Sequence, residues 1–346
     1  MSSGVRPWFC RLVDALPAPP WGAALAIFAG VAGLRGLALV GNRLLSDAPM
    51  DVTAVLLVDL VLQPAGVAYF LVFGGWLVIE GSVRDMAELR PLLARTPDAP
   101  SPAEIALQPR GRLLAAALAG PMLPVVLHAI SPGSAGPTSA LLGGEPLGFA
   151  EVYHLVGQVV FWIAFGPVLV SWIVGMHRFW RCGRDQVRID LLDLQALTPF
   201  ARFGLRLSLV VLAIPLLLAP AAVFGYAPAP VEVLLYLGIM VVGLAALVVP
   251  SWGLHRSIQE AKAAELARVR RALAGDRSSL RDSPVATDAD RLSVVDLAVW
   301  QDRVEGLREW PFDAAALRRF GLYLLIPLGS WVGAALVERL VDRAFG

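Results

Sequence analysis

The chain has 346 residues, of which 57% are hydrophobic and 16% are charged, and its mean hydropathy is +0.66. This composition lies far on the apolar side for a soluble protein of that length, so it predicts a polytopic membrane protein. The net charge of +1, with arginines interleaved with acids, argues against a nucleic-acid partner.

Seven apolar segments have about the length that a helix needs to cross the hydrocarbon core of a bilayer. They are Trp21–Leu44, Thr53–Ile79, Leu113–Ile130, Val152–Met176, Phe203–Phe224, Val231–Leu254 and Phe320–Val337. We therefore predict an all-α fold with seven transmembrane helices, for which the lipid bilayer is the first partner.

The basic residues predict the orientation of these helices. If the N-terminus lies inside, the cytoplasmic segments hold 25 of the 29 lysines and arginines. Such an excess marks cytoplasmic loops, so we expect the N-terminus inside and the C-terminus outside. Lysine occurs once, at Lys262, in a chain rich in Arg, Ala, Gly and Pro, as is typical of GC-rich bacterial genomes. A multi-pass protein of a bacterial inner membrane is the expected setting.

The chain divides into four regions by charge and hydropathy. These are a cytoplasmic N-terminal segment at 1–20, transmembrane helices one to six at 21–254, a cytoplasmic helical anchor region at 255–312 with a flexible polar linker at 276–289, and the last transmembrane helix at 313–346. The last helix is thus split between cytoplasm and membrane.

Two of the membrane helices are predicted to continue into the cytoplasm. Span four runs on through Arg184, after which Val187, Leu191 and Leu194 predict a short amphipathic helix. Span six shows no break beyond Pro250 and keeps one apolar stripe as far as Leu273. Gly275 then ends it.

A charged helix at 290–310 precedes the last span. Its apolar residues Leu297, Trp300, Val304 and Leu307 share one face, which we interpret as a protein-binding face and an oligomer anchor. Trp310-Pro311 is expected to end this helix, because proline disfavours helical geometry in the residue before it.

No charge interrupts 320–337. One face of this span holds Leu322, Leu325, Gly329, Val332 and Leu336, which would form a narrow apolar pore lining if the helix lies on an oligomer axis. Gly329 and Gly333 form a small-xxx-small pair that permits close helix packing. Alternatively, this pair only seats the helix against the others within a monomer.

Two charged residues lie inside predicted spans. Arg35 and Asp59 fall at similar depths in spans one and two, so we predict an intramembrane ion pair between them. The alternative is that each side chain reaches the outer interface separately.

The common catalytic motifs are absent. The sequence has no HExxH, GxSxG, Walker loop or CxxC pattern, so no enzymatic activity is expected. His128 and His154 are too few to predict a metal site, and no cofactor is expected. The cytoplasmic position of Lys262 excludes a retinal-binding lysine inside the bundle.

The order of these parts resembles the insect odorant and gustatory receptor superfamily of seven-span ion channels. The matching parts are the extension of span four through Arg184, that of span six through Leu273, the helix at 290–310 and the span from Phe320. The resemblance lies in architecture, as for a remote bacterial homologue. It implies a homotetrameric ion channel, gated by a small-molecule ligand, with the last span lining the pore.

Two other functions stay open. A small-molecule transporter would use the polar residues inside the membrane, which are Arg35, Asp59 and Gln63. A membrane scaffold would bind a cytoplasmic protein through the apolar stripes of the helices at 254–310.

Overall fold

The computed structural model describes residues 4–45, 58–93, 108–122, 149–215, 217, 230–286, 292–312, 318, 320–322, 325 and 343. Nearly all of these residues are helical, as the sequence predicts. Besides turns and irregular connections, the described residues include two two-residue strands, β1 (Gly4–Val5) and β2 (Gln108–Pro109), which pair antiparallel.

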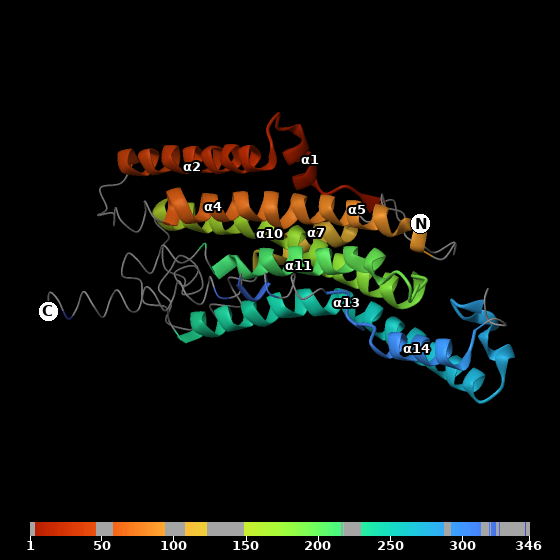
Figure 1. Ribbon diagram of the computed structural model, residues 1–346. Coiled ribbons are helices and arrows are strands. Elements are labelled where there is room, and N and C mark those ends of the chain that lie inside the picture. The colour runs from red at the N-terminus through yellow and green to blue at the C-terminus, as the bar shows by residue number, and fades with distance from the viewer. Residues whose placement is uncertain are drawn as a thin grey trace.

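The described residues form fifteen helical elements along the chain. They are α1 (Trp8–Ala15), α2 (Pro20–Leu45), η1 (Val58–Leu62), α4 (Gln63–Ala68), η2 (Tyr69–Leu77), α5 (Val78–Leu89), η3 (Arg90–Leu92), α7 (Arg110–Ala119), α10 (Phe149–Arg181), η4 (Cys182–Gln186), η5 (Leu194–Leu197), α11 (Thr198–Leu212), α13 (Pro230–Leu273), η6 (Arg277–Asp282) and α14 (Val294–Glu305). Figure 1 shows α2, α4, α10, α11 and the first half of α13 lying side by side in a bundle.

Within the part of the chain that the structure describes, four helical segments are long and apolar enough to cross a membrane: Pro20–Gly41, Leu60–Leu92, Leu155–Gln186 and Tyr236–Leu273. They coincide with predicted spans one, two, four and six. Spans three, five and seven are represented in the described residues by α7, α11 and a few positions after Phe312, so the seven-span topology stays a prediction. Large apolar side chains on the outside of the bundle, such as Leu34, Leu37, Leu118 and Leu237, fit contact with lipid.

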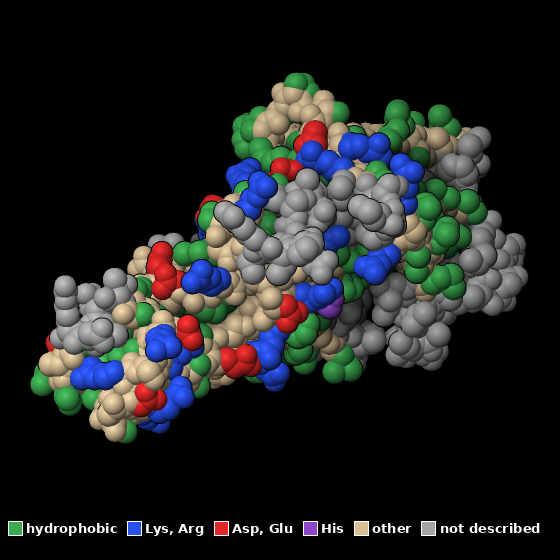
Figure 2. Space-filling view, turned by 90° about the vertical axis from the view of Figure 1, so that its right-hand side faces the viewer, with side chains coloured by type: hydrophobic (Ala, Val, Ile, Leu, Met, Phe, Trp, Pro, Cys, Tyr) green, Lys and Arg blue, Asp and Glu red, His purple; other side chains and the backbone are tan. Residues whose placement is uncertain are grey.

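Arginines gather at one end of this bundle. Exposed arginines lie at the end of α5 (Arg90), in the first turn of α7 (Arg110 and Arg112) and at the end of α10 (Arg181). Figure 2 views the molecule from that side. Contacts join these helix ends, because β1 pairs with β2 and Leu93 bridges to Val187. The bundle therefore has one strongly basic end.

The second membrane segment contains two stretches of π-helix, η1 and η2. A π-helix displaces backbone carbonyls from the regular ladder, and a bilayer offers no water to satisfy them. Here Trp172 of α10 donates its indole N–H to the carbonyl of Gly74 at 2.6 Å. The hydroxyl of Tyr69 in turn donates to the carbonyl of Val210 in α11 at 2.5 Å. Side-chain hydrogen bonds thus connect η2 to both neighbouring helices.

The long helix α13 agrees with the sequence prediction. It runs unbroken past the buried Pro250 to Leu273, and Figure 1 shows it changing direction part-way along, as an internal proline commonly causes. Gly275 follows with a φ of 108°, a left-handed conformation that glycine adopts without strain. The prediction that Gly275 ends the helix is confirmed.

Beyond the bundle, α13 and α14 form an antiparallel hairpin with η6 between them. The helix α14 begins with a capping box, in which Ser293 accepts from the amide of Asp296 and Asp296 accepts from the amide of Ser293. The hydrogen bonds from Ser293 lower the pKa of Asp296. The helix ends at Glu305, with Gly306 as its C-cap, and so stops before the expected Trp310-Pro311.

The structure bears on two expectations about connecting segments. The described part of the predicted linker at 276–289 contains η6 and the buried side chains of Leu280 and Ser283, and the flexibility of this linker stays a prediction. The amphipathic helix expected from Val187 to Leu194 is absent: Val187 bridges to Leu93, and only η5 is helical, as a short 3₁₀ turn. In the segment from Val187 to Leu194, a contact with a residue far along the chain therefore outweighs the local apolar pattern.

Glycines allow the backbones of the long helices to touch. A Cβ atom on Gly253 of α13 would lie 2.2 Å from the carbonyl oxygen of Trp180 in α10. A Cβ atom on Gly238 of the same helix would meet no atom within 4 Å. Only the first glycine is therefore required for packing.

We predict that Gly253→Ala lowers the apparent unfolding temperature of the purified protein in detergent. The added methyl group would clash with the backbone of Trp180, which cannot move aside as a flexible side chain can. The expected cost is about 1–3 kcal/mol, as for overpacking in other cores. Gly238→Ala is the matched control and should be neutral or slightly stabilising. Equal unfolding temperatures for the two variants would contradict this account of the α10 and α13 contact.

Candidate functional site

The predicted pore-lining face is described at two of its five positions. Leu322 and Leu325 are 64% and 60% exposed, whereas Phe320 is only 6% exposed and packs with Leu212 and Leu247. Gly329, Val332 and Leu336, together with the packing residue Gly333, lie outside the described residues. The start of the last segment therefore has one face on the bundle and another face open.

The structure places Arg35 but does not test its predicted ion pair. Arg35 is only 8% exposed, and its guanidinium packs against Gly157 of α10, where a Cβ atom would lie 1.7 Å from Nη2. The side chain of Asp59 lies outside the described residues, so the pair with Asp59 stays a prediction. In α4, the amide oxygen of Gln63 is buried and accepts no hydrogen bond from the described residues.

The four predicted anchor residues lie on the inner side of the hairpin. Leu297, Trp300 and Val304 are buried in a cluster with Val269 and Ala272 of α13, and Leu307 packs at its edge. One chain thus covers both apolar stripes without a second protein. The predicted roles of this face in binding a protein partner and in anchoring an oligomer stay predictions.

A buried carboxylate fixes the centre of this hairpin. Glu265 of α13 is fully buried and accepts hydrogen bonds from the indole of Trp300 at 3.0 Å and from the hydroxyl of Ser283 at 2.5 Å. Arg268 adds an ion pair at 2.8 Å. Since each of these donors compensates for lost hydration, the charge is tolerated inside the hairpin.

The chain's single lysine holds the end of α14. Lys262 donates to the carbonyl oxygens of Glu305 at 2.7 Å and Leu307 at 3.2 Å, and it pairs with the carboxylate of Glu309 at 3.3 Å. A cation is favourable at this place because the last carbonyls of a helix lack partners and carry the negative end of its dipole. Sequence analysis used Lys262 only to exclude a retinal site.

Glu309 contributes to the same contact in a pH-dependent way. Hydrogen bonds from Gln259 and Lys262 lower its pKa. A carboxyl group whose pKa is lowered by folding stabilises the fold above its ordinary pKa. That contribution is lost as the pH falls through the lowered value.

An aromatic stack continues from this lysine toward the membrane segment. The ring of Trp310 lies 4.2 Å from that of His255, nearly parallel to it, and meets Trp252 edge-on at 5.8 Å. Phe312 also stacks on the ring of Trp310, with 6.0 Å between the ring centroids, and it is buried. We call residues 306–312 the connector, because they join α14 to the last segment while packed on α13.

A buried ion network joins α5 to α11 at the basic end of the bundle. The carboxylate of Asp85 is buried and lies 2.9 Å from Arg206 and 3.3 Å from Arg202. Arg202 also pairs with the exposed Glu88. Gly81 leaves room for this arrangement, because a Cβ atom there would fall within the guanidinium of Arg206.

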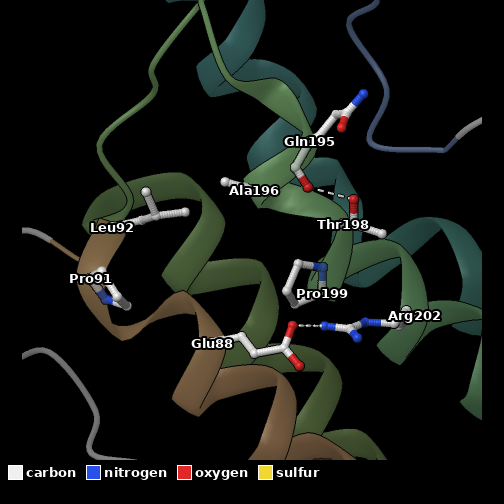
Figure 3. A pocket seen from close by; sticks show the side chains of 8 residues that line it. All are labelled: Glu88, Pro91, Leu92, Gln195, Ala196, Thr198, Pro199 and Arg202. Carbon is white, nitrogen blue, oxygen red and sulfur yellow. Dashed lines mark hydrogen bonds and ion pairs between the residues drawn. The ribbon is translucent and has the colours of Figure 1, made fainter.

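A small cleft of about 350 Å³ opens beside this network (Figure 3). Its lining residues come from α5, η3, η5 and α11 and are Glu88, Pro91, Leu92, Gln195, Ala196, Thr198, Pro199 and Arg202. The two charged side chains, Glu88 and Arg202, pair with each other, and Thr198 donates its hydroxyl to the carbonyl of Gln195. The cleft is therefore a concave surface whose charged side chains already pair with each other, and its lining shows no group of free polar atoms that would bind a ligand.

Among the described residues, no group of three or more His, Cys, Asp or Glu side chains could hold a metal ion. The polar features of the molecule are instead paired networks that join one helix to another. No protein-family model matches the chain, and no curated protein or solved structure is detectably similar to it.

We predict that Asp85→Asn destabilises the bundle by about 1–3 kcal/mol, because the half-buried Arg206 loses its charge-assisted hydrogen bond to the Asp85 carboxylate. Glu88→Gln is the control, since this exposed partner of Arg202 contributes at most about 1 kcal/mol. Unfolding temperatures in detergent measure both. A loss in Asp85→Asn no larger than that in Glu88→Gln would show that the buried pair does not join α5 to α11.

We also predict that Lys262→Met speeds amide hydrogen exchange in α14 about tenfold, because charge-assisted bonds to two carbonyls are lost. Gln259→Met removes only a bond to the Glu309 carboxylate, so its effect should be smaller. Exchange measured by mass spectrometry on peptides covering 294–307 provides the comparison. Unchanged exchange in Lys262→Met would mean that apolar packing alone holds the helix.

Proposed function

We propose that the chain is the subunit of a tetrameric membrane ion channel whose last membrane segment lines the pore. The observation that carries this proposal is the contrast at the start of that segment. Phe320 is packed into the bundle, while Leu322 and Leu325 are open to the outside. A pore-lining helix needs such an open apolar face in each subunit, and apolar constrictions can gate by excluding water.

The connector supports a route for gating. Lys262, His255 and Trp252 of α13 hold residues 306–312, and Phe312 and Phe320 share one apolar cluster with α11 and α13. A displacement of the hairpin would therefore act on the last segment through a short, packed connection. A small-molecule ligand is the gating signal that the architectural resemblance implies.

The arginine-rich end of the bundle supports the proposed orientation. That end would lie in the cytoplasm of a bacterial cell, with the hairpin beyond it and the C-terminus outside. Seven spans in this orientation would complete the topology.

A transporter is the second candidate function. It is favoured by Arg35 of α2, which is buried against Gly157 of α10, and by the buried amide oxygen of Gln63, which accepts no hydrogen bond from the described residues. Buried polar groups within a membrane commonly mark substrate or ion paths. A scaffold is less well supported, because its two proposed binding stripes pack against each other within the hairpin. It would have to use another surface, such as the exposed Val295 and Val299 of α14.

The subunit count separates these candidates. We expect native mass spectrometry of the protein in lipid nanodiscs to show four copies, and ion flux in proteoliposomes to accompany them. A monomer would remove the axis on which a pore depends and would favour the transporter.

Cysteine labelling tests the pore face itself. In a channel, Leu325→Cys should react with a water-soluble thiol reagent added on both sides of the membrane. Leu237→Cys, at a comparably exposed leucine on the outer face of α13, should stay unlabelled in lipid. The two native cysteines are buried and give little background. If both introduced cysteines resist labelling, Leu325 faces lipid and the proposed pore face is wrong.

A further inference from the structure

The outer face of α13 carries an exposed apolar stripe. Val241, Ala245, Val249 and Trp252 follow one another at intervals of three or four residues and are all exposed. At the helical rise of 1.5 Å per residue this stripe is about 16 Å long. That length is about half of a bilayer's hydrocarbon thickness, or one leaflet.

A cation ends the stripe. Arg256, one turn beyond Trp252 on the same face, is exposed, and its guanidinium carbon lies 6.0 Å from the centroid of the Trp252 ring. One further turn along, the exposed residue is the charged Glu260, which pairs with Arg184. The surface of α13 therefore changes from apolar to charged within about two turns.

The neighbouring helix α10 shows the same change. Its exposed residues pass from Ile173 to His177 and then to Arg181 at successive turns. Tryptophan and arginine at such a transition are typical of the boundary between hydrocarbon and lipid headgroups. Two helices thus indicate one membrane boundary, which crosses α13 between Trp252 and Arg256.

We propose that Arg256 binds the headgroup phosphate of an anionic phospholipid whose acyl chain lies along Val241, Val249 and Trp252. This site needs the chain to lie in a bilayer, but it does not depend on channel activity. The charge is available, because no carboxylate among the described residues lies within ion-pair distance of Arg256. The adjoining apolar stripe selects a lipid over a free phosphate, since only a lipid covers both surfaces at once.

This lipid would touch the connector as well. Trp252 meets Trp310 edge-on, and His255, the residue before Arg256, stacks on Trp310. The headgroup would thus sit beside the contact that holds the last membrane segment to α13.

Lipid binding by the full-length protein tests the proposal. The protein in detergent is titrated with phosphatidylglycerol or phosphatidylcholine, and bound lipid is counted by native mass spectrometry. We expect phosphatidylglycerol to be retained preferentially, and Arg256→Gln to weaken its binding about fivefold, the usual effect of one basic residue near an anionic surface. Arg256→Lys should keep most of the binding, because it keeps the charge.

The control is Arg281→Gln, which removes the same charge from an exposed arginine of η6, away from the bundle. It should bind phosphatidylglycerol as the unmodified protein does. The proposal is overturned if Arg256→Gln retains full binding, if Arg281→Gln loses as much, or if phosphatidylcholine binds equally well. Glycerol phosphate without acyl chains should not compete at millimolar concentration, and competition would indicate a free-phosphate site instead.

Discussion

The continuity of α13 is the constraint on which the rest of the molecule depends. A single helix of 44 residues packs against α10 and α11 with its first half and pairs with α14 with its second. Because α13 is helical without interruption from Pro230 to Leu273, it joins the bundle directly to the hairpin, although Pro250 has no N–H to donate within the helix. The bundle and the hairpin therefore share one structural element rather than a flexible joint.

Much of this arrangement could be predicted from local sequence. The length of α13, its end at Gly275 and the apolar faces of both hairpin helices follow from helical periodicity and glycine conformation. The same periodicity cannot say what covers an apolar face. Leu297 and Trp300 were therefore predicted to meet another protein, although they meet Val269 of their own chain.

The residues that sequence reasoning missed act through partners far along the chain. Asp85 lies 121 residues from Arg206, and Lys262 lies 43 residues from the Glu305 carbonyl that it binds. Neither pair has a local spacing that would indicate it. The π-helix η2 could not be predicted from local sequence either, because its hydrogen bonds to neighbouring helices join distant residues. Trp172 of α10 donates to the carbonyl of Gly74 in η2, and Tyr69 of η2 donates to the carbonyl of Val210 in α11. In the last span, Phe320 is buried and Leu325 is exposed, and the pore-lining face predicted from spacing stays a prediction.

Because the chain contains a single lysine, an amine-reactive reagent can modify its side chains at one position. Apart from the N-terminus, Lys262 is the one primary amine available to acylating reagents, and its side chain is only 15% exposed. While it holds the end of α14, its nitrogen is engaged by the carbonyls of Glu305 and Leu307 and by the carboxylate of Glu309, which shield it from a reagent. The rate of amine acylation would therefore report how often the hairpin releases the connector, with no label introduced by mutation.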